Sequence, residues 1–142
     1  MSWRVGLSAA VVAIVSVAAV VIALASTSGF DGAERVKGAI QWPPSCGDPL
    51  ITRPSRDPMV QKWARYAVQS AVVSCGAGGP HVDYVKFRDT RARDDAVIAG
   101  LPRTRVCLTG AAAVIDNLAA QDITVFSDMC RALGGTIAGT AS

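Results

Sequence analysis

The stretch HVDYVKFRD, residues 81–89, alternates like a strand whose two faces meet different surroundings. One face carries Val85 and Phe87. The other face carries Tyr84, Lys86 and Arg88. We therefore expect this segment to be a strand of a sheet, and the segments around it are interpreted from that starting point.

The segments that follow this strand predict two helices and three more strands. Residues 90–101 (TRARDDAVIAGL) are typical of a short helix that ends near a glycine. Residues 103–110 (RTRVCLTG) and 111–118 (AAAVIDNL) predict two strands joined by a tight turn. Asp122 is expected to cap a second helix, and residues 136–139 (TIAG) can add a last strand.

The order from His81 onward is therefore strand, helix, strand, strand, helix, strand. This order resembles the ferredoxin-like superfold, or split βαβ arrangement, which implies helices on one face of an antiparallel sheet. Before it, the pair Asp57-Pro58 predicts the start of a helix that runs to about Ser74. The fold class expected for residues 57–142 is a small α+β domain, one helix followed by a ferredoxin-like βαββαβ unit.

Residues 29–56 are expected to form an extracytoplasmic tether. Several glycines and prolines interrupt this segment, and prolines exclude helix and favour extended chain. Cys46 lies within it and can pin the tether to the domain.

Four cysteines, Cys46, Cys75, Cys107 and Cys130, predict two disulfides. Their wide spacing, without a C-x-x-C pair, argues against zinc and thioredoxin-like sites. The leading pairing joins nearest neighbours, Cys46 with Cys75 and Cys107 with Cys130. Cys107 has the alternation of Arg105, which can turn it away from the last helix, so pairing of Cys75 with Cys107 stays open.

Residues 1–28 are expected to export the chain. Val5 to Ala25 is a run of 21 residues without charge or proline. As a helix it measures about 31 Å, which matches the hydrocarbon core of a bilayer. The run therefore predicts a single-pass signal-anchor, and the alternative is a signal peptide cleaved after Ala25, which releases a secreted protein.

Location follows from combining this run with the cysteines. Arg4 on one side opposes Arg35 and Lys37 on the other, so charge alone gives no orientation. Disulfides form outside the cytoplasm, which predicts that the N-terminus is inside and the domain is extracytoplasmic. The abundance of Arg, Ala, Val and Gly over Lys is typical of a high-GC bacterial genome.

No complete catalytic or metal-binding constellation is found in the sequence. His81 is the only histidine, and Asp83 lies two residues on, but no nucleophile motif such as G-x-S-x-G accompanies them. Glu34 is the only glutamate, and the thiols are expected to be oxidised, so no metal and no cofactor are expected. A formal net charge of +3 argues against nucleic acid as a partner.

A basic face is the one binding surface that the sequence suggests. It comprises Tyr84, Lys86, Arg88, Arg103 and Arg105. Such a face suits anionic lipid headgroups or an anionic wall polymer, although interleaved aspartates favour an ordinary solvated surface.

Taken together, the sequence predicts a membrane-anchored, non-catalytic binding or accessory domain of the bacterial cell envelope, with an envelope protein as partner. Two alternatives are a small secreted hydrolase that uses His81 and an inhibitor or effector released by signal cleavage.

Overall fold

The computed structural model describes residues 31–99, 104–118 and 123–139. The chain divides into two compact units, Met1–Asp31 and Gly32–Ser142, and the second contains the sheet and its helices. Within the described ranges, no helix is both long and apolar enough to cross a membrane. The expected anchor, Val5–Ala25, lies outside those ranges.

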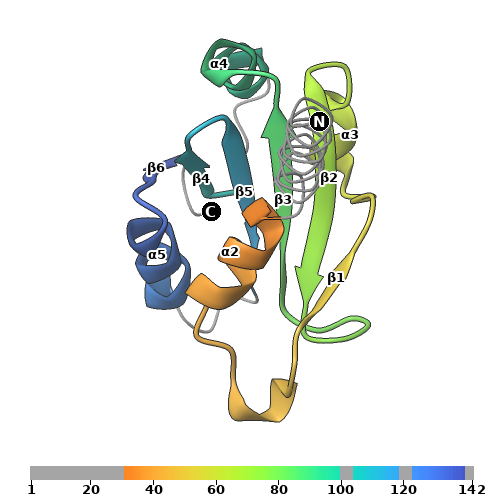
Figure 1. The fold of residues 1–142 in the computed structure, drawn as a ribbon, viewed down its shortest axis with the longest axis vertical. Coiled ribbons are helices and arrows are strands. Elements are labelled where there is room, and N and C mark those ends of the chain that lie inside the picture. The colour runs from red at the N-terminus through yellow and green to blue at the C-terminus, as the bar shows by residue number, and fades with distance from the viewer. Residues whose placement is uncertain (1–30, 100–103, 119–122, 140–142) are drawn as a thin grey trace, which may run out of the picture. The chain divides into compact units, whose positions relative to one another are not determined.

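A six-stranded antiparallel sheet runs through the second unit in the order β1-β2-β3-β5-β4-β6 (Figure 1). β3 (His81–Phe87), the strand expected from its alternation, lies inside the sheet. Its neighbours are β2 (Ala67–Ser74) and β5 (Ala112–Asn117). The sheet is completed by β4 and two short edge strands: β4 (Val106–Thr109), β1 (Leu50–Thr52) and β6 (Thr136–Ala138). The α+β class is therefore confirmed.

One face of the sheet is covered by α2 (Asp31–Ala39) and α5 (Ile123–Ala132). Alternate residues of a strand point to opposite faces, so this side receives Val82 and Tyr84 of β3 and Val114 of β5. Together with apolar residues of the two helices they form one buried cluster.

The opposite face is covered by α3 (Pro58–Trp63) and α4 (Thr90–Ala99). This side receives Val85 and Phe87 of β3 and Ile115 of β5. The sheet is therefore sandwiched between two helical layers, each with its own buried cluster.

The ferredoxin-like arrangement is correct up to β5 and wrong in its last strand. β3, α4 and β4 form a split βαβ unit with β5 between the two strands. In that superfold the last strand lies beside the first, but here β2 takes that place and β6 pairs with β4. The connection from β3 through α4 to β4 and the connection from β5 through α5 to β6 both move in the same direction along the sheet. Because β5 runs opposite to β3, two right-handed crossovers of this kind place α4 and α5 on opposite faces. The sequence predicts that the helices share one face of the sheet. In the structure α4 and α5 lie on opposite faces.

The helix expected over residues 57–74 is correct only in its first part. Asp57 caps α3 as expected, but α3 ends at Trp63 and the remainder forms β2. Ala71 fits a helical stripe and also alternates with Val73, and both are fully buried in the sheet. Pairing along the whole of β3 outweighs the local helical pattern, since it buries this alternating face.

The tether expected over residues 29–56 is largely part of the folded domain. Ala33, Val36 and Ile40 recur at helical spacing and are buried when α2 forms. The glycines beside them concealed that pattern in the sequence. A short 3₁₀ turn, η1 (Pro44–Cys46), and β1 follow, so the prolines exclude α-helix only from the later part of the segment.

Two disulfides are present, and they join Cys46 to Cys75 and Cys107 to Cys130. The first ties η1 to the end of β2, and the second lies buried between β4 and α5. Cys107 does share a face with Arg105, but α5 covers that face because it lies opposite α4.

Candidate functional site

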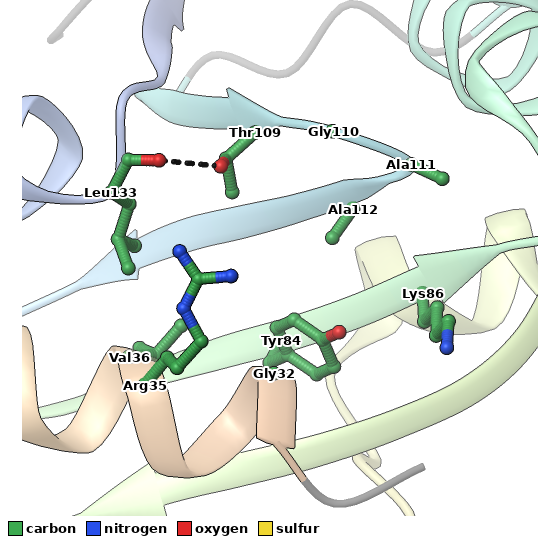
Figure 2. A pocket seen from close by; sticks show the side chains of 10 residues that line it. All are labelled: Gly32, Arg35, Val36, Tyr84, Lys86, Thr109, Gly110, Ala111, Ala112 and Leu133. Carbon is green, nitrogen blue, oxygen red and sulfur yellow. Dashed lines mark hydrogen bonds between the residues drawn. The ribbon is translucent and has the colours of Figure 1, made fainter. Parts of the chain in front are cut away.

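A cavity of about 200 Å³ lies between α2, β3 and the hairpin that joins β4 to β5 (Figure 2). We call it the α2 cavity. Residues from all three elements line it, with one more from the end of α5: Gly32, Arg35, Val36, Tyr84, Lys86, Thr109, Gly110, Ala111, Ala112 and Leu133.

Tyr84 is the largest buried group that lines the α2 cavity. Only 5% of the residue is exposed, yet its hydroxyl makes no hydrogen bond within the described part of the chain. Burial raises the pKa of Tyr84, and the charges of Arg35 and Arg53 lower it in part. The hydroxyl is therefore protonated at neutral pH and can donate a hydrogen bond to a ligand.

Gly32 allows Tyr84 to occupy this position. A Cβ atom added at Gly32 collides with the hydroxyl oxygen and the adjoining ring carbon of Tyr84. Any larger residue at position 32 must therefore displace the tyrosine or α2 itself. The first turn of α2 and the ring of Tyr84 form one packed unit along this wall of the cavity.

Two cationic side chains from separate elements line the α2 cavity. Arg35 extends from α2 toward the hairpin, and Lys86 lies on β3 on the side to which the Tyr84 hydroxyl points (Figure 2). Among the residues that the structure describes, neither cation has an ion-pair partner, and no carboxylate lines the cavity. The cavity therefore combines two positive charges with one free hydroxyl donor.

Thr109 holds the hairpin against the end of α5. Its hydroxyl donates a hydrogen bond to the Leu133 carbonyl oxygen at 2.9 Å (Figure 2). The hydroxyl hydrogen is thus occupied, and Thr109 acts here as a structural group. Val36, Ala112 and Leu133 give the cavity an apolar part beside its charged one.

The basic face expected from the sequence is only partly assembled. Tyr84 and Lys86 lie together in the α2 cavity, whereas Arg88 is exposed and pairs with Asp89 at 3.3 Å. Arg103 lies outside the described residues.

Arg105 belongs to a different environment from the cavity. Its guanidinium pairs with Asp116 at 2.7 Å, lies over the Phe126 ring and is largely buried. The arginine that lines the α2 cavity is Arg35, which is not among the residues that the sequence predicts for the basic face. The helical spacing of Ala33, Val36 and Ile40 is the sequence signal that would place Arg35 on a helix, and the glycines and prolines around it favour a tether instead.

A second polar cluster lies on the opposite face of the sheet, and we call it the Asp83 cluster. Asp83 is 1% exposed and accepts hydrogen bonds from the Ser55 hydroxyl at 2.5 Å and from the Asn117 amide at 2.6 Å. His81 Nε2 lies 3.7 Å from the same carboxylate. The Asn117 amide also donates a hydrogen bond to the Asp57 carboxylate at 3.3 Å. Every carboxylate oxygen of Asp83 therefore has a partner within the chain.

The Asp83 cluster brings a serine, a histidine and an aspartate together, but not in the order of a hydrolytic triad. In a triad the histidine lies between the serine and the aspartate. Here Ser55 donates to Asp83 directly, and His81 Nδ1 lies 3.2 Å from the Gly79 carbonyl oxygen. The arrangement orients Ser55 toward the carboxylate, where it stabilises the loop before α3.

Within the described ranges no group of three histidine, cysteine, aspartate or glutamate side chains could hold a metal ion. Comparison of the chain with protein-family models, with curated proteins and with solved structures finds no match.

Proposed function

We propose that this protein is a non-catalytic binding or accessory module of the bacterial cell envelope, and that the α2 cavity is its ligand site. The observation that carries the proposal is the state of the polar groups in that cavity. Arg35, which is exposed, half-buried Lys86 and Tyr84 all line one hollow, and none of the three has a partner in the described part of the chain. Polar groups that the fold itself does not satisfy are available to a ligand.

Binding is favoured over catalysis by the chemistry of the cavity lining. A hydrolytic site needs a nucleophile beside a general base. The Thr109 hydroxyl is already engaged, and burial keeps Tyr84 protonated. What the lining offers is positive charge and one hydrogen-bond donor, which are means of recognising an anion.

The proposed location follows from the disulfides and the apolar run Val5–Ala25. Both cysteine pairs are joined, and disulfides are stable in extracytoplasmic compartments. The apolar run then serves as the export signal and, if it is not cleaved, as the membrane anchor. An envelope protein or an anionic envelope component is the partner that this location makes available.

The test is fractionation and cross-linking of the full chain in its native cells. We expect the chain in the membrane fraction, accessible to protease from outside, and cross-linked to an envelope component. Arg35→Glu should remove the cross-link. Arg91→Glu makes the same charge change on α4, on the other side of the sheet, and should leave it intact. A cytoplasmic chain, or cross-linking that ignores Arg35→Glu, contradicts the proposal.

A further inference from the structure

We infer that the α2 cavity binds a phosphoryl group, held by the Arg35 guanidinium, the Lys86 ammonium and the Tyr84 hydroxyl. This inference rests on the proposed binding function and names its ligand chemistry. Nothing in it requires a catalytic step.

The lining of the α2 cavity is positively charged. The described lining holds two cations and no carboxylate, so the cavity carries an excess of two positive charges. A carboxylate balances only one of them, whereas a phosphate monoester carries about −1.5 to −2 at neutral pH. A phosphate monoester is therefore the common biological anion that fits the charge of this cavity.

The arrangement of the donors also favours a phosphate. Arg35 extends from α2 toward the hairpin, whereas Tyr84 and Lys86 come from β3, and Lys86 lies beyond the Tyr84 hydroxyl as seen from Arg35 (Figure 2). The planar guanidinium can bind two oxygens of one phosphate, and the flexible lysine stem allows the ammonium to turn toward another. Donors from two elements suit the three terminal oxygens of a tetrahedral group better than the two oxygens of a flat carboxylate.

The burial of the Tyr84 ring also favours a bound ligand. Its ring is buried against α2, a position that requires Gly32, yet its hydroxyl faces the cavity without a partner in the described chain. Among the described residues, the one fully buried side-chain polar atom without a partner is Trp63 Nε1, so the Tyr84 hydroxyl reaches the open cavity and not a sealed interior. It is thus a hydrogen-bond donor held in a rigid setting, where a ligand oxygen can replace water.

Size and lining limit what is attached to the phosphate. The cavity has a volume of about 200 Å³ and is partly open to solvent. It holds a phosphate and a few further atoms, which can contact Val36, Ala112 and Leu133. The ligand is therefore a small phosphate ester, or the phosphate headgroup of a larger molecule.

The experiment is calorimetric titration of the full chain in an uncharged detergent. The probes are glycerol 1-phosphate, inorganic phosphate and acetate, and nanodiscs containing phosphatidate provide the lipid arm. We expect glycerol 1-phosphate or the nanodiscs to bind, and Arg35→Gln and Lys86→Gln each to weaken binding about tenfold or more. Tyr84→Phe should weaken it about threefold to tenfold. Arg91→Gln, an exposed arginine on α4, should bind as the unchanged chain does.

The outcomes separate the ligand sources and the two proposals. Binding of glycerol 1-phosphate supports a soluble ester, and binding of phosphatidate nanodiscs alone supports a headgroup. The inference is overturned if no phosphate probe binds or if acetate binds as tightly as phosphate. It is also overturned if Arg35→Gln and Lys86→Gln both leave binding unchanged. If one cation variant does not fold, the other carries the test. A chain that cross-links in the envelope but binds no phosphate leaves the proposed function standing and removes only its phosphoryl ligand.

Discussion

Asp83 and Tyr84 are neighbours on β3, and their surroundings are opposite in kind. Asp83 points to the α3 side, where Ser55 and Asn117 satisfy it completely. Tyr84 points to the α2 side, also buried, and its hydroxyl has no partner in the described chain. A buried polar group that the chain satisfies contributes to the fold, whereas a hydroxyl that borders an open cavity without a partner in the described chain is available to a ligand. The predictions below test that difference.

The largest effect is expected at Asp83. Asp83→Val leaves the buried Ser55 hydroxyl without an acceptor and removes the shorter of the two hydrogen bonds that the Asn117 amide donates, which should cost about 3 kcal/mol of unfolding free energy. Urea unfolding followed by tryptophan fluorescence measures it, because Trp63 is buried against Phe87. Asp83→Asn keeps one acceptor oxygen and should lose less. A loss below about 1 kcal/mol for Asp83→Val would show that the cluster does not stabilise the fold.

The next effect is expected at Gly32, the contact that places Tyr84. Gly32→Ala forces the ring or α2 to move and should cost about 1 to 3 kcal/mol. In a Tyr84→Leu background the clash is absent, so the same substitution should cost clearly less. Equal costs in the two backgrounds would mean that the two residues are not coupled. The double-mutant cycle is measured by the same urea unfolding.

A smaller effect is expected at His81, on the edge of the Asp83 cluster. Its side chain is 38% exposed and lies 3.7 Å from the carboxylate, so His81→Ala should cost under about 1 kcal/mol. The same variant tests the alternative of a hydrolase that uses His81. If His81→Ala abolishes the cellular phenotype while thermal unfolding is unchanged, His81 has a functional role and not a structural one, which favours the hydrolase.

The smallest effect on stability is expected at Tyr84 itself. Tyr84→Phe removes a hydroxyl without a partner in the described chain and should change the unfolding free energy by no more than about 0.5 kcal/mol at neutral pH. Its effect on ligand binding is expected to be the larger one, which is the reverse of Asp83. A stability loss comparable to that of Asp83→Val would place the hydroxyl in the fold's own network.

Alkaline pH should lower the stability of the unchanged chain through the Tyr84 hydroxyl. The pKa of Tyr84 is raised above its ordinary value of 10.0 by burial. As pH rises, the Tyr84 hydroxyl therefore loses its proton in the unfolded chain before it does so in the folded chain. The contribution of the protonated hydroxyl to the free energy of unfolding is complete below pH 10 and is lost as pH rises through the folded pKa. Unfolding between pH 8 and 11 should show a steeper decline for the unchanged chain than for Tyr84→Phe. Parallel curves would mean that Tyr84 does not titrate differently in the two states.

The sequence predicted those elements whose pattern depends only on local residues. The alternation around β3, the capped start of α3 and the tight turn between β4 and β5 are all local signals, and the structure has each of them. The second half of the helix expected over 57–74 failed because Ala71 fits both a helical and an alternating stripe. Its partner strand decides between the two, and pairing with that strand is not visible in the local pattern.

The candidate site was predictable only in part, for a similar reason. Tyr84 and Lys86 could be assigned to one face because alternation is local. Arg35 could not be added to them, since it arrives on α2 from a segment whose glycines and prolines suggested a tether. His81 and Asp83 could be paired from the sequence because they are two residues apart on one strand. Ser55 and Asn117 could not be added, because they meet Asp83 only after residues far apart in the chain are packed together.

The Cys46–Cys75 disulfide has a thermodynamic consequence for the α2 cavity. α2 supplies Gly32 and Arg35 to the cavity, and this bond ties the arm that carries α2 to the end of β2. If the α2 cavity binds a ligand as proposed, a ligand that holds α2 against β3 stabilises the disulfide-linked segment, and by reciprocity the disulfide raises the affinity for that ligand. On that proposal, cavity occupancy and the oxidation state of this cysteine pair are linked quantities, so reduction of the Cys46–Cys75 bond should weaken ligand binding.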